Sequence, residues 1–266
     1  MIVEIAKAKL NLALHVRARR PDGYHELETL FAFVEDGDLL SLAAADADSF
    51  ILTGPFAAAL QGEGDNLVTR AAGAFRERFG GGRHAIALDK RLPVASGIGG
   101  GSADAAATLR ALGRLHDVPV DAMFAIADAL GSDVPGCLYG RTAIGRGRGE
   151  RLEPVPGLPG TPALLVNPGV AVSTAEVFRR WDGVDRGALP ADPREGRNDL
   201  EPPARAIAPV IGEVLDALAG SPGAGLVRMS GSGATCFALF DSDASRDAAA
   251  EALSDHGWWL MATHLT

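Results

Sequence analysis

Residues 93–102, PVASGIGGGS, combine a crowded set of glycines with a serine that opens an alanine-rich stretch of helical character. Glycine permits backbone dihedrals that other residues avoid, and it lets a ligand come close to the backbone. A helix that begins directly after such a loop presents unpaired N–H groups and the positive end of its dipole. The loop is therefore predicted to be a receptor for a polyphosphate. Its predicted members are Gly97, Gly99, Gly100, Gly101 and Ser102.

Two common phosphate motifs do not describe this loop. The P-loop ends in Gly-Lys-Ser/Thr, and no lysine follows Gly101. The dinucleotide fingerprint requires a βαβ unit with an acidic residue roughly 20 residues further on. Asp117 and Asp121 lie in that range, but the residues between are typical of two helices. The alternative is that this loop is only a flexible turn between a strand and a helix and binds no ligand.

Phosphoryl transfer needs two groups besides a phosphate receptor. One activates the acceptor hydroxyl, and the other supplies positive charge to the transferring group. Asp133, in the turn sequence GSDVPG, is a candidate for the first role. Lys9 is a candidate for the second, and Asn11 lies two residues on, hence on the same face of a strand. The alternatives are a turn carboxylate for Asp133 and a strand-edge lysine for Lys9.

Two further turns could contact a ligand. Ser230-Gly231-Ser232-Gly233 lies between two apolar segments, where it could form a backbone wall beside the substrate or the phosphates. Tyr24 and His25 follow a proline turn, and such a pair can stack on a base and bind it by hydrogen bonds. The alternatives are a tight hairpin connection for the first turn and a solvent-exposed turn for the second.

The composition describes a globular protein of one large or two modest domains. Of its 266 residues, 47% are hydrophobic and 22% charged. The net charge of −9 argues against nonspecific nucleic-acid binding. No apolar run has the length of a membrane span, and the N-terminus lacks the layout of a signal peptide, so a cytoplasmic protein is expected. Cys137 and Cys236 have no metal-ligand spacing and are expected to be buried thiols.

Lysine is rare in this chain. Only three of the 25 basic residues are lysines, namely Lys7, Lys9 and Lys90. A lysine retained in an arginine-rich chain could serve where a compact ammonium is needed rather than a planar guanidinium. Two of the three lie in the first predicted strand and the third shortly before the glycine loop.

Strands and helices are expected to alternate irregularly, which indicates an α+β protein. The pattern predicts a turn at Asp36-Gly37-Asp38 between two strands, a helix capped by Asp65 or Asn66, and no helix over 131–140. Residues 154–162 are the candidate linker, and 182–197 are expected to be a loose segment. The predicted strands cover 2–16, 27–36, 39–43, 49–53, 84–90 and 163–168, with a hairpin over 141–155, two strands within 225–240 and a last strand ending at His264. The predicted helices cover 66–79, 102–115, 121–130, 173–181, 198–206, 209–219 and 243–253.

Three segments resemble the GHMP kinase family, and the resemblance runs nearly from end to end. They are AKLNL at 8–12, the glycine motif from Pro93 to Ser102, and MSGSGA at 229–234. Within the family, the chain is most similar to members that phosphorylate 4-diphosphocytidyl-2-C-methyl-D-erythritol. The more specific strings are RPDGYHEL at 20–27, the ETLF that follows, GSDVP, and G-x-G-x-GE at 145–150.

The resemblance implies a two-domain fold with the active site in the cleft between an ATP-binding domain, 1–153, and a C-terminal domain, 154–266. It implies transfer of the ATP γ-phosphoryl to the 2-hydroxyl of that substrate. Asp133 would orient or deprotonate the hydroxyl, and Lys9 would pair with Asp133. The implied nucleotide-binding residues are Asn66 and Lys90, which match positions near the nucleotide base, together with Pro93, Gly97, Gly99, Gly100, Gly101 and Ser102. The implied substrate-binding residues are Asn11, Tyr24, His25, Thr174, Phe178, Gly231 and Ser232.

Two departures from the family pattern stand out. Lys7 occupies a position where the family often has proline, and no acidic metal-ligand motif is evident. Mg²⁺ would then be held mainly by ATP phosphates and water, with Ser102 nearby. Another sugar or alcohol kinase of the family would share the glycine motif without needing Tyr24 and His25. A nucleotide-binding regulatory protein on the same scaffold would need neither Lys9 nor Asp133.

Overall fold

The structure, a computed structural model, describes residues 1–60 and 66–266 and confirms the α+β class. It consists of two compact units, and strands β1 (Ile2–Arg19) and β2 (His25–Ala45) each contribute residues to both. The first unit comprises 1–8, 36–94 and 99–140, and the second 9–35, 95–98 and 141–266. The candidate linker, 154–162, lies wholly within the second unit. The division into domains at residues 153 and 154 stays a prediction.

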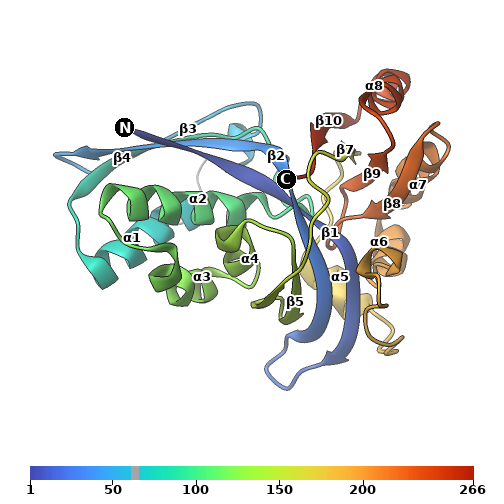
Figure 1. Ribbon diagram of the computed structural model, residues 1–266, viewed down its shortest axis with the longest axis horizontal. Coiled ribbons are helices and arrows are strands. Elements are labelled where there is room, and N and C mark those ends of the chain that lie inside the picture. Colours follow the sequence, from blue (N-terminus) through green and yellow to red (C-terminus); the bar gives the residue numbers. More distant parts are fainter. Residues whose placement is uncertain (61–65) are drawn as a thin grey trace. The chain divides into compact units, whose positions relative to one another are not determined.

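In the first unit, helices gather on one side of a sheet (Figure 1). Strand β4 (Arg83–Asp89) pairs antiparallel with residues 39–45 of β2 and parallel with β3 (Ser49–Thr53). The helices are α1 (Leu67–Phe79), α2 (Gly100–Leu115), α3 (Phe124–Leu130) and α4 (Val134–Tyr139). Short 3-10 helices cover Ala57–Leu60 and Val120–Met123. Their buried faces meet in an apolar core that includes Phe75, Leu88 and Leu112.

The predicted turn at Asp36-Gly37-Asp38 is wrong, because β2 continues through these residues. Gly37 instead allows the backbone of β2 to lie very close to the backbone of β1. A Cβ on Gly37 would lie 2.5 Å from the carbonyl carbon of Ala6 and 2.8 Å from Cα of Lys7. A glycine within a strand that allows such an approach gives the same sequence signal as a glycine in a turn.

The prediction that residues 131–140 contain no helix is also wrong, because helix α4 lies there. Asp133 is its N-cap residue, Pro135 lies in the first turn, and Gly140 ends it with φ +65°. Proline is tolerated in a first turn, because N–H groups there have no helical acceptor.

At the start of α1, Asn66 is the cap, and its Oδ1 accepts the backbone N–H of Thr69 at 3.0 Å. The other predicted cap, Asp65, lies outside the described residues.

The second unit is built on two sets of strands. Strand β5 (Ala143–Gly147) pairs with residues 27–31 of β2 and with β6 (Arg151–Pro154), which confirms the predicted hairpin. A separate four-stranded antiparallel sheet has the order β10 (Trp259–His264), β7 (Pro162–Asn167), β9 (Cys236–Phe240), β8 (Ala224–Met229). Helices α5 (Thr174–Arg180), α6 (Glu201–Ile207), α7 (Val210–Ala219) and α8 (Asp243–Ala252) bury apolar side chains in this unit's core. Short 3-10 helices cover Pro193–Glu195 and Ser254–His256.

Across residues 1–60 and 66–266, none of the helices is long and apolar enough to cross a membrane. The longest, α2, has 16 residues and carries charged side chains.

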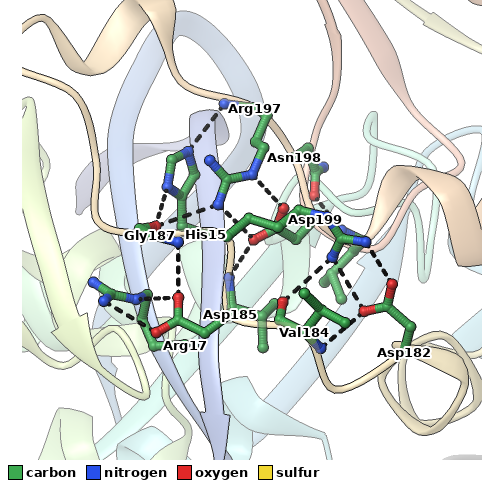
Figure 2. A network of polar contacts seen from close by, with 12 residues as sticks. His15, Arg17, Asp182, Val184, Asp185, Gly187, Arg197, Asn198 and Asp199 are labelled. Atoms are coloured by element: carbon green, nitrogen blue, oxygen red, sulfur yellow. Dashed lines mark hydrogen bonds and ion pairs between the residues drawn. The ribbon is translucent and has the colours of Figure 1, made fainter.

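The segment 182–199 has little regular structure, yet it is tied to β1 by many polar contacts (Figure 2). Backbone bonds join Leu14 N to Arg197 O and Asp199 N to Leu14 O, each at 2.8 Å. Arg17 donates to both carboxylate oxygens of Asp185, at 2.8 and 3.2 Å. The carboxylate of Asp199 in turn accepts the backbone N–H of Val16 at 2.8 Å. The segment 182–199 is therefore held along β1 by these contacts, although it has little regular secondary structure.

His15 lies at the centre of this network and is fully buried. Its Nε2 accepts the backbone N–H of Arg197 at 3.1 Å, so Nδ1 carries the proton and donates to Gly187 O at 3.0 Å. Burial lowers the pKa of His15, and the positive charge of Arg197 adds to this effect. The hydrogen bonds thus require the neutral ring, which the environment favours.

We expect acid to weaken the fold partly through His15. Its pKa is lower in the folded than in the unfolded chain, so the unfolded chain takes up a proton first as pH falls below about 6.5. The free energy of unfolding should fall as the pH drops from about 6.5 to the folded pKa, and His15→Gln should flatten this dependence. Chemical denaturation between pH 7 and 5 measures the slope. If the slope in the His15→Gln variant equals that of the wild type, His15 does not contribute to this pH dependence.

Candidate active site

Lys9 and Asn11 share one face of β1, as their spacing predicts. Lys9 Nζ donates to Asn11 Oδ1 at 2.8 Å, and both side chains are buried. The ammonium also lies 5.4 Å from the centroid of the Phe31 ring. A buried lysine is costly unless its charge is compensated, so the burial of Lys9 indicates a polar site and not a side chain that reaches solvent.

Asn11 joins β1 to two other segments of the second unit. Its Nδ2 donates to Thr29 Oγ1 of β2 at 2.7 Å, and its backbone N–H donates to Ser230 Oγ at 3.1 Å. The Ser230 hydroxyl donates in turn to Gly97 O at 3.0 Å. Lys9 N also donates to Ile98 O at 2.9 Å. The first part of the glycine loop, the first strand and the C-terminal glycine turn thus meet at one place.

The two glycine turns approach each other too closely for side chains. Gly97 has φ +79°, and a Cβ on it would lie 2.8 Å from Gly233 O and 2.9 Å from Gly233 N. A Cβ on Gly231, φ +56°, would lie 2.8 Å from Gly97 O. Glycine is therefore required at both positions by sterics as well as by backbone conformation.

Asn198, which the sequence pattern does not single out, anchors the second glycine turn. Its Nδ2 donates to Met229 O at 2.7 Å and to Gly231 O at 2.8 Å. On the other side of the turn, the hydroxyls of Ser232 and Thr174 lie 2.8 Å apart and share a hydrogen bond. Thr174 and Ser232 were each predicted as substrate-binding residues, and the structure brings them together.

The second part of the glycine loop belongs to the first unit. Gly99 has φ +65° and is the N-cap residue of α2, which begins at Gly100, two residues before the predicted start. Gly100, Gly101 and Ser102 therefore form the first turn, whose N–H groups have no acceptor within the helix. Pro93 is buried ahead of the loop. This geometry presents backbone donors at the positive end of a helix dipole, as an anion site requires.

Lys90 is fully buried in the first unit, where its ammonium donates to Asp38 Oδ2 and, at 2.7 Å, to Asp104 Oδ2. Burial opposes its charge, but the carboxylates of Asp104 and Asp38 outweigh that effect and raise the pKa of Lys90. Burial raises the pKa of Asp104 to about 7, although Lys90 acts in the opposite direction. Neither carboxylate was predicted from the sequence, because nothing local in the chain connects them. Contact of Lys90 or Asn66 with the nucleotide base stays a prediction.

Asp133 is half-buried at the start of α4 in the first unit. Its carbonyl accepts the backbone N–H of Cys137 at 3.0 Å, and its side chain makes no cap hydrogen bond to the helix. The helix thus orients the residue through its backbone and leaves the carboxylate for other contacts. Lys9 belongs to the second unit, and the pairing of Lys9 with Asp133 stays a prediction.

An aromatic group in the second unit surrounds His25. The rings of His25 and Phe178 have centroids 4.8 Å apart and contact each other directly, and Trp181 adds an edge-on ring at 5.7 Å. Stacking of a base by His25 and Phe178 stays a prediction. Burial, with a smaller effect of Arg19, lowers the pKa of His25. His25 Nε2 is a buried atom without a hydrogen-bond partner in the described structure. Tyr24 is 51% exposed, and the guanidinium carbon of Arg148 lies 5.0 Å from its ring centroid.

Cavity volume alone does not identify this site. A cavity of about 570 Å³ in the second unit is lined mainly by apolar residues, including Leu12, Leu30 and Ile144. It contains none of the predicted site residues.

Among the described residues, no group of three or more His, Cys, Asp or Glu side chains is arranged to hold a metal ion.

The chain is similar to proteins of one known family. Residues 66–141 match the GHMP kinases N terminal domain, and residues 188–257 match the GHMP kinases C terminal model. A 4-diphosphocytidyl-2-C-methyl-D-erythritol kinase of Rhizorhabdus wittichii is 56% identical, covering 98% of this chain and 94% of its own. One from Novosphingobium aromaticivorans is 53% identical, covering 97% and 90%.

A solved structure gives the same result for the fold. The crystal structure of a 4-(cytidine 5'-diphospho)-2C-methyl-D-erythritol kinase matches with a TM-score of 0.85 and 40% identity, covering 99% of both chains. The two family models together span more than half of the sequence. The chain therefore belongs to the GHMP kinase family.

Proposed function

We propose that this kinase transfers the γ-phosphoryl group of ATP to the 2-hydroxyl of 4-diphosphocytidyl-2-C-methyl-D-erythritol, a step of the non-mevalonate pathway to isoprenoid precursors. Relatives that carry the name of this activity match the chain over nearly its whole length. Among family kinases, the choice of acceptor rests on one observation. The His25 ring packs against the Phe178 ring and carries a buried Nε2 without a hydrogen-bond partner in the described structure, which supports recognition of a pyrimidine. The test is ATP turnover with the cytidyl substrate compared with galactose and homoserine.

ATP would bind through backbone N–H groups at the start of α2. Gly97, Gly99 and Gly100 would let the phosphates approach the backbone, and Gly101 and Ser102 complete the first turn. Mg²⁺ would arrive with ATP, held by phosphate oxygens and water near the Ser102 hydroxyl, since magnesium retains several waters. Bound there, it would neutralise part of the phosphate charge.

Asp133 is proposed to orient the acceptor hydroxyl and to take its proton, and Lys9 to stabilise negative charge on the transferring group. Phosphoryl transfer leaves the protein mainly positioning and electrostatic work. Asn11 would hold the Lys9 ammonium in place, because its Oδ1 accepts from Nζ. Thr174, Gly231 and Ser232 would bound the acceptor pocket.

A cytoplasmic location is also proposed. Cys137 and Cys236 are both buried thiols, as expected in a reducing compartment. The net charge of −9 supports small-molecule substrates over nucleic acid.

The first prediction concerns the phosphate receptor. Gly101→Val should raise the Kd of a non-hydrolysable ATP analogue about tenfold or more, because charge-assisted bonds contribute about 1.5–3 kcal/mol each. A Cβ at Gly101 meets only Leu67 Cδ1, at 3.6 Å, so the fold should tolerate it. Gly73→Val, in α1 where a Cβ meets nothing within 4 Å, is the matched control. Equal affinities of the two variants by calorimetry would place the phosphates elsewhere.

The second prediction concerns the base. His25→Ala should raise the KM of the cytidyl substrate strongly, because a lost stacking partner costs about 1–3 kcal/mol. The KM of ATP should change little. His25→Phe should recover part of the loss, since it restores a ring without the ring nitrogen. His256→Ala, which removes a ring stacked on Trp258 at 4.3 Å, is the control and should leave both KM values unchanged. A parallel rise in the KM of ATP for His25→Ala would indicate a folding role.

The third prediction concerns the chemical step. Asp133→Asn should lower kcat by about 10²–10⁴-fold, the usual contribution of a general base, while both substrates still bind. Arginine should not replace Lys9 functionally in the Lys9→Arg variant, because a planar guanidinium takes the place of a compact ammonium. Asp128→Asn, on the exposed side of α3, is the control. Near wild-type turnover of Asp133→Asn would rule out the assigned role.

The Asp133→Asn/Lys9→Ala double variant tests whether the two residues act as a unit. If they do, the double variant should be little slower than the slower single variant. Fully additive losses would show that each acts independently.

A further inference from the structure

Three buried charged residues lie next to the glycine loop, and only Lys90 among them is a predicted site residue. Asp38 comes from β2, Lys90 follows β4, and Asp104 lies in α2. All three are in the first unit and almost completely buried. Lys90 is one of only three lysines in a chain with 25 basic residues. An ion network in such a place needs an explanation, because burying charges costs several kcal/mol per ion.

Asp38 holds the backbone at the entrance to the loop. Its Oδ1 accepts the backbone N–H groups of Arg91 and Leu92, at 2.6 and 2.8 Å, while its Oδ2 accepts from Lys90. The backbone of Lys90 is itself fixed, since its N–H donates to Thr53 O at 2.7 Å. The chain therefore leaves β4 in a direction set by one carboxylate.

Lys90 carries this restraint across to the far end of the loop. Its Nζ donates to Asp104 Oδ2 in α2 at 2.7 Å. A Cβ on Gly100 would lie only 3.1 Å from the same Nζ, so the ammonium packs directly against the first turn of the helix. One cation thus joins the residues before the loop to the helix after it.

The compactness of the ammonium explains why this position is a lysine. An ammonium can donate to two carboxylates in a narrow space, whereas a guanidinium has a planar and larger fork. Apolar side chains would stabilise the same core as well or better. What they could not supply is a directional restraint between β4 and α2, which is the feature that a preorganised anion site needs.

We propose that Asp38 and Asp104, acting through Lys90, are positioning residues that fix both ends of the glycine loop so that the backbone donors of α2 meet the phosphates of the nucleotide. The proposal rests on the proposed function in taking ATP as the ligand. It gives Lys90 a role in phosphate binding without contact to the base. It also predicts which part of ATP loses affinity when the network is cut.

Asp104→Leu is the variant that tests this role. Leucine is similar in shape to aspartate, and the variant leaves Lys90 and Asp38 as a charge-balanced pair. Three probes are titrated by calorimetry: ADP, inorganic tripolyphosphate and adenosine. We expect the Kd values of ADP and tripolyphosphate to rise together by about 10- to 100-fold, as small misplacements of a site can cause, and the Kd of adenosine to stay within twofold of wild type.

Two further variants separate positioning from general stability. Asp104→Asn keeps an oxygen acceptor for Lys90 and should recover most of the tripolyphosphate affinity. Glu4→Gln weakens a different restraint on α2, the ion pairs of Glu4 with Arg110 and Arg114, at 3.1 and 2.7 Å. It should lower Tm without changing any of the three Kd values. If Asp104→Leu fails to fold, Asp38→Asn/Lys90→Met/Asp104→Leu removes all three charges without leaving one of them buried and unpaired, and the same result is expected.

Two results would overturn the proposal. One is a folded Asp104→Leu whose tripolyphosphate affinity equals that of wild type. The other is a loss of adenosine affinity alone, which would make Lys90 a base contact as the family resemblance implies. Neither result depends on the acceptor, so a wild-type enzyme that binds ATP but does not phosphorylate the cytidyl substrate would refute the proposed function and leave this test intact.

Discussion

A glycine-rich loop that is proposed to bind phosphate through its backbone N–H groups cannot be held in place by its own side chains, because glycines have none. The restraints must come from neighbouring segments. In the first unit they come from Asp38 and Lys90, which fix the chain where it leaves β4 and where α2 begins. In the second unit they come from Ser230, whose hydroxyl donates to Gly97 O. These buried polar contacts restrain the loop from outside it.

The same logic extends along β1. Asn11 uses its side-chain oxygen for Lys9, its side-chain nitrogen for Thr29, and its backbone N–H for Ser230. One residue therefore positions the proposed charge-stabilising lysine and supports the glycine turn. Further along β1, His15 and Arg17 hold the irregular segment that leads to Asn198, which anchors the opposite side of that turn (Figure 2). The strand works as a common base for elements that are distant in sequence.

Sequence patterns predicted the parts of the site that depend on local geometry. The period of a strand was enough to place Lys9 and Asn11 on one face, and the glycine loop followed by alanines was enough to predict a helix N-terminus. The pattern failed where a residue's role depends on a distant backbone. Gly37 was taken for a turn, because its steric partner, Ala6, is far away in sequence. Asp38, Asp104 and Asn198 carry no local signal, since each acts on a segment that only the tertiary fold brings near.

The contact between the two glycine turns has a consequence for how this protein can vary. At Gly97 and Gly231 the missing Cβ leaves space that is filled by backbone atoms of the opposite turn. Many core positions can drift in evolution, because a larger side chain on one side is offset by a smaller one on the other. Here neither turn has a side chain left to shorten. The two turns are therefore bound to remain glycine together, and a change at one cannot be rescued by any substitution at the other.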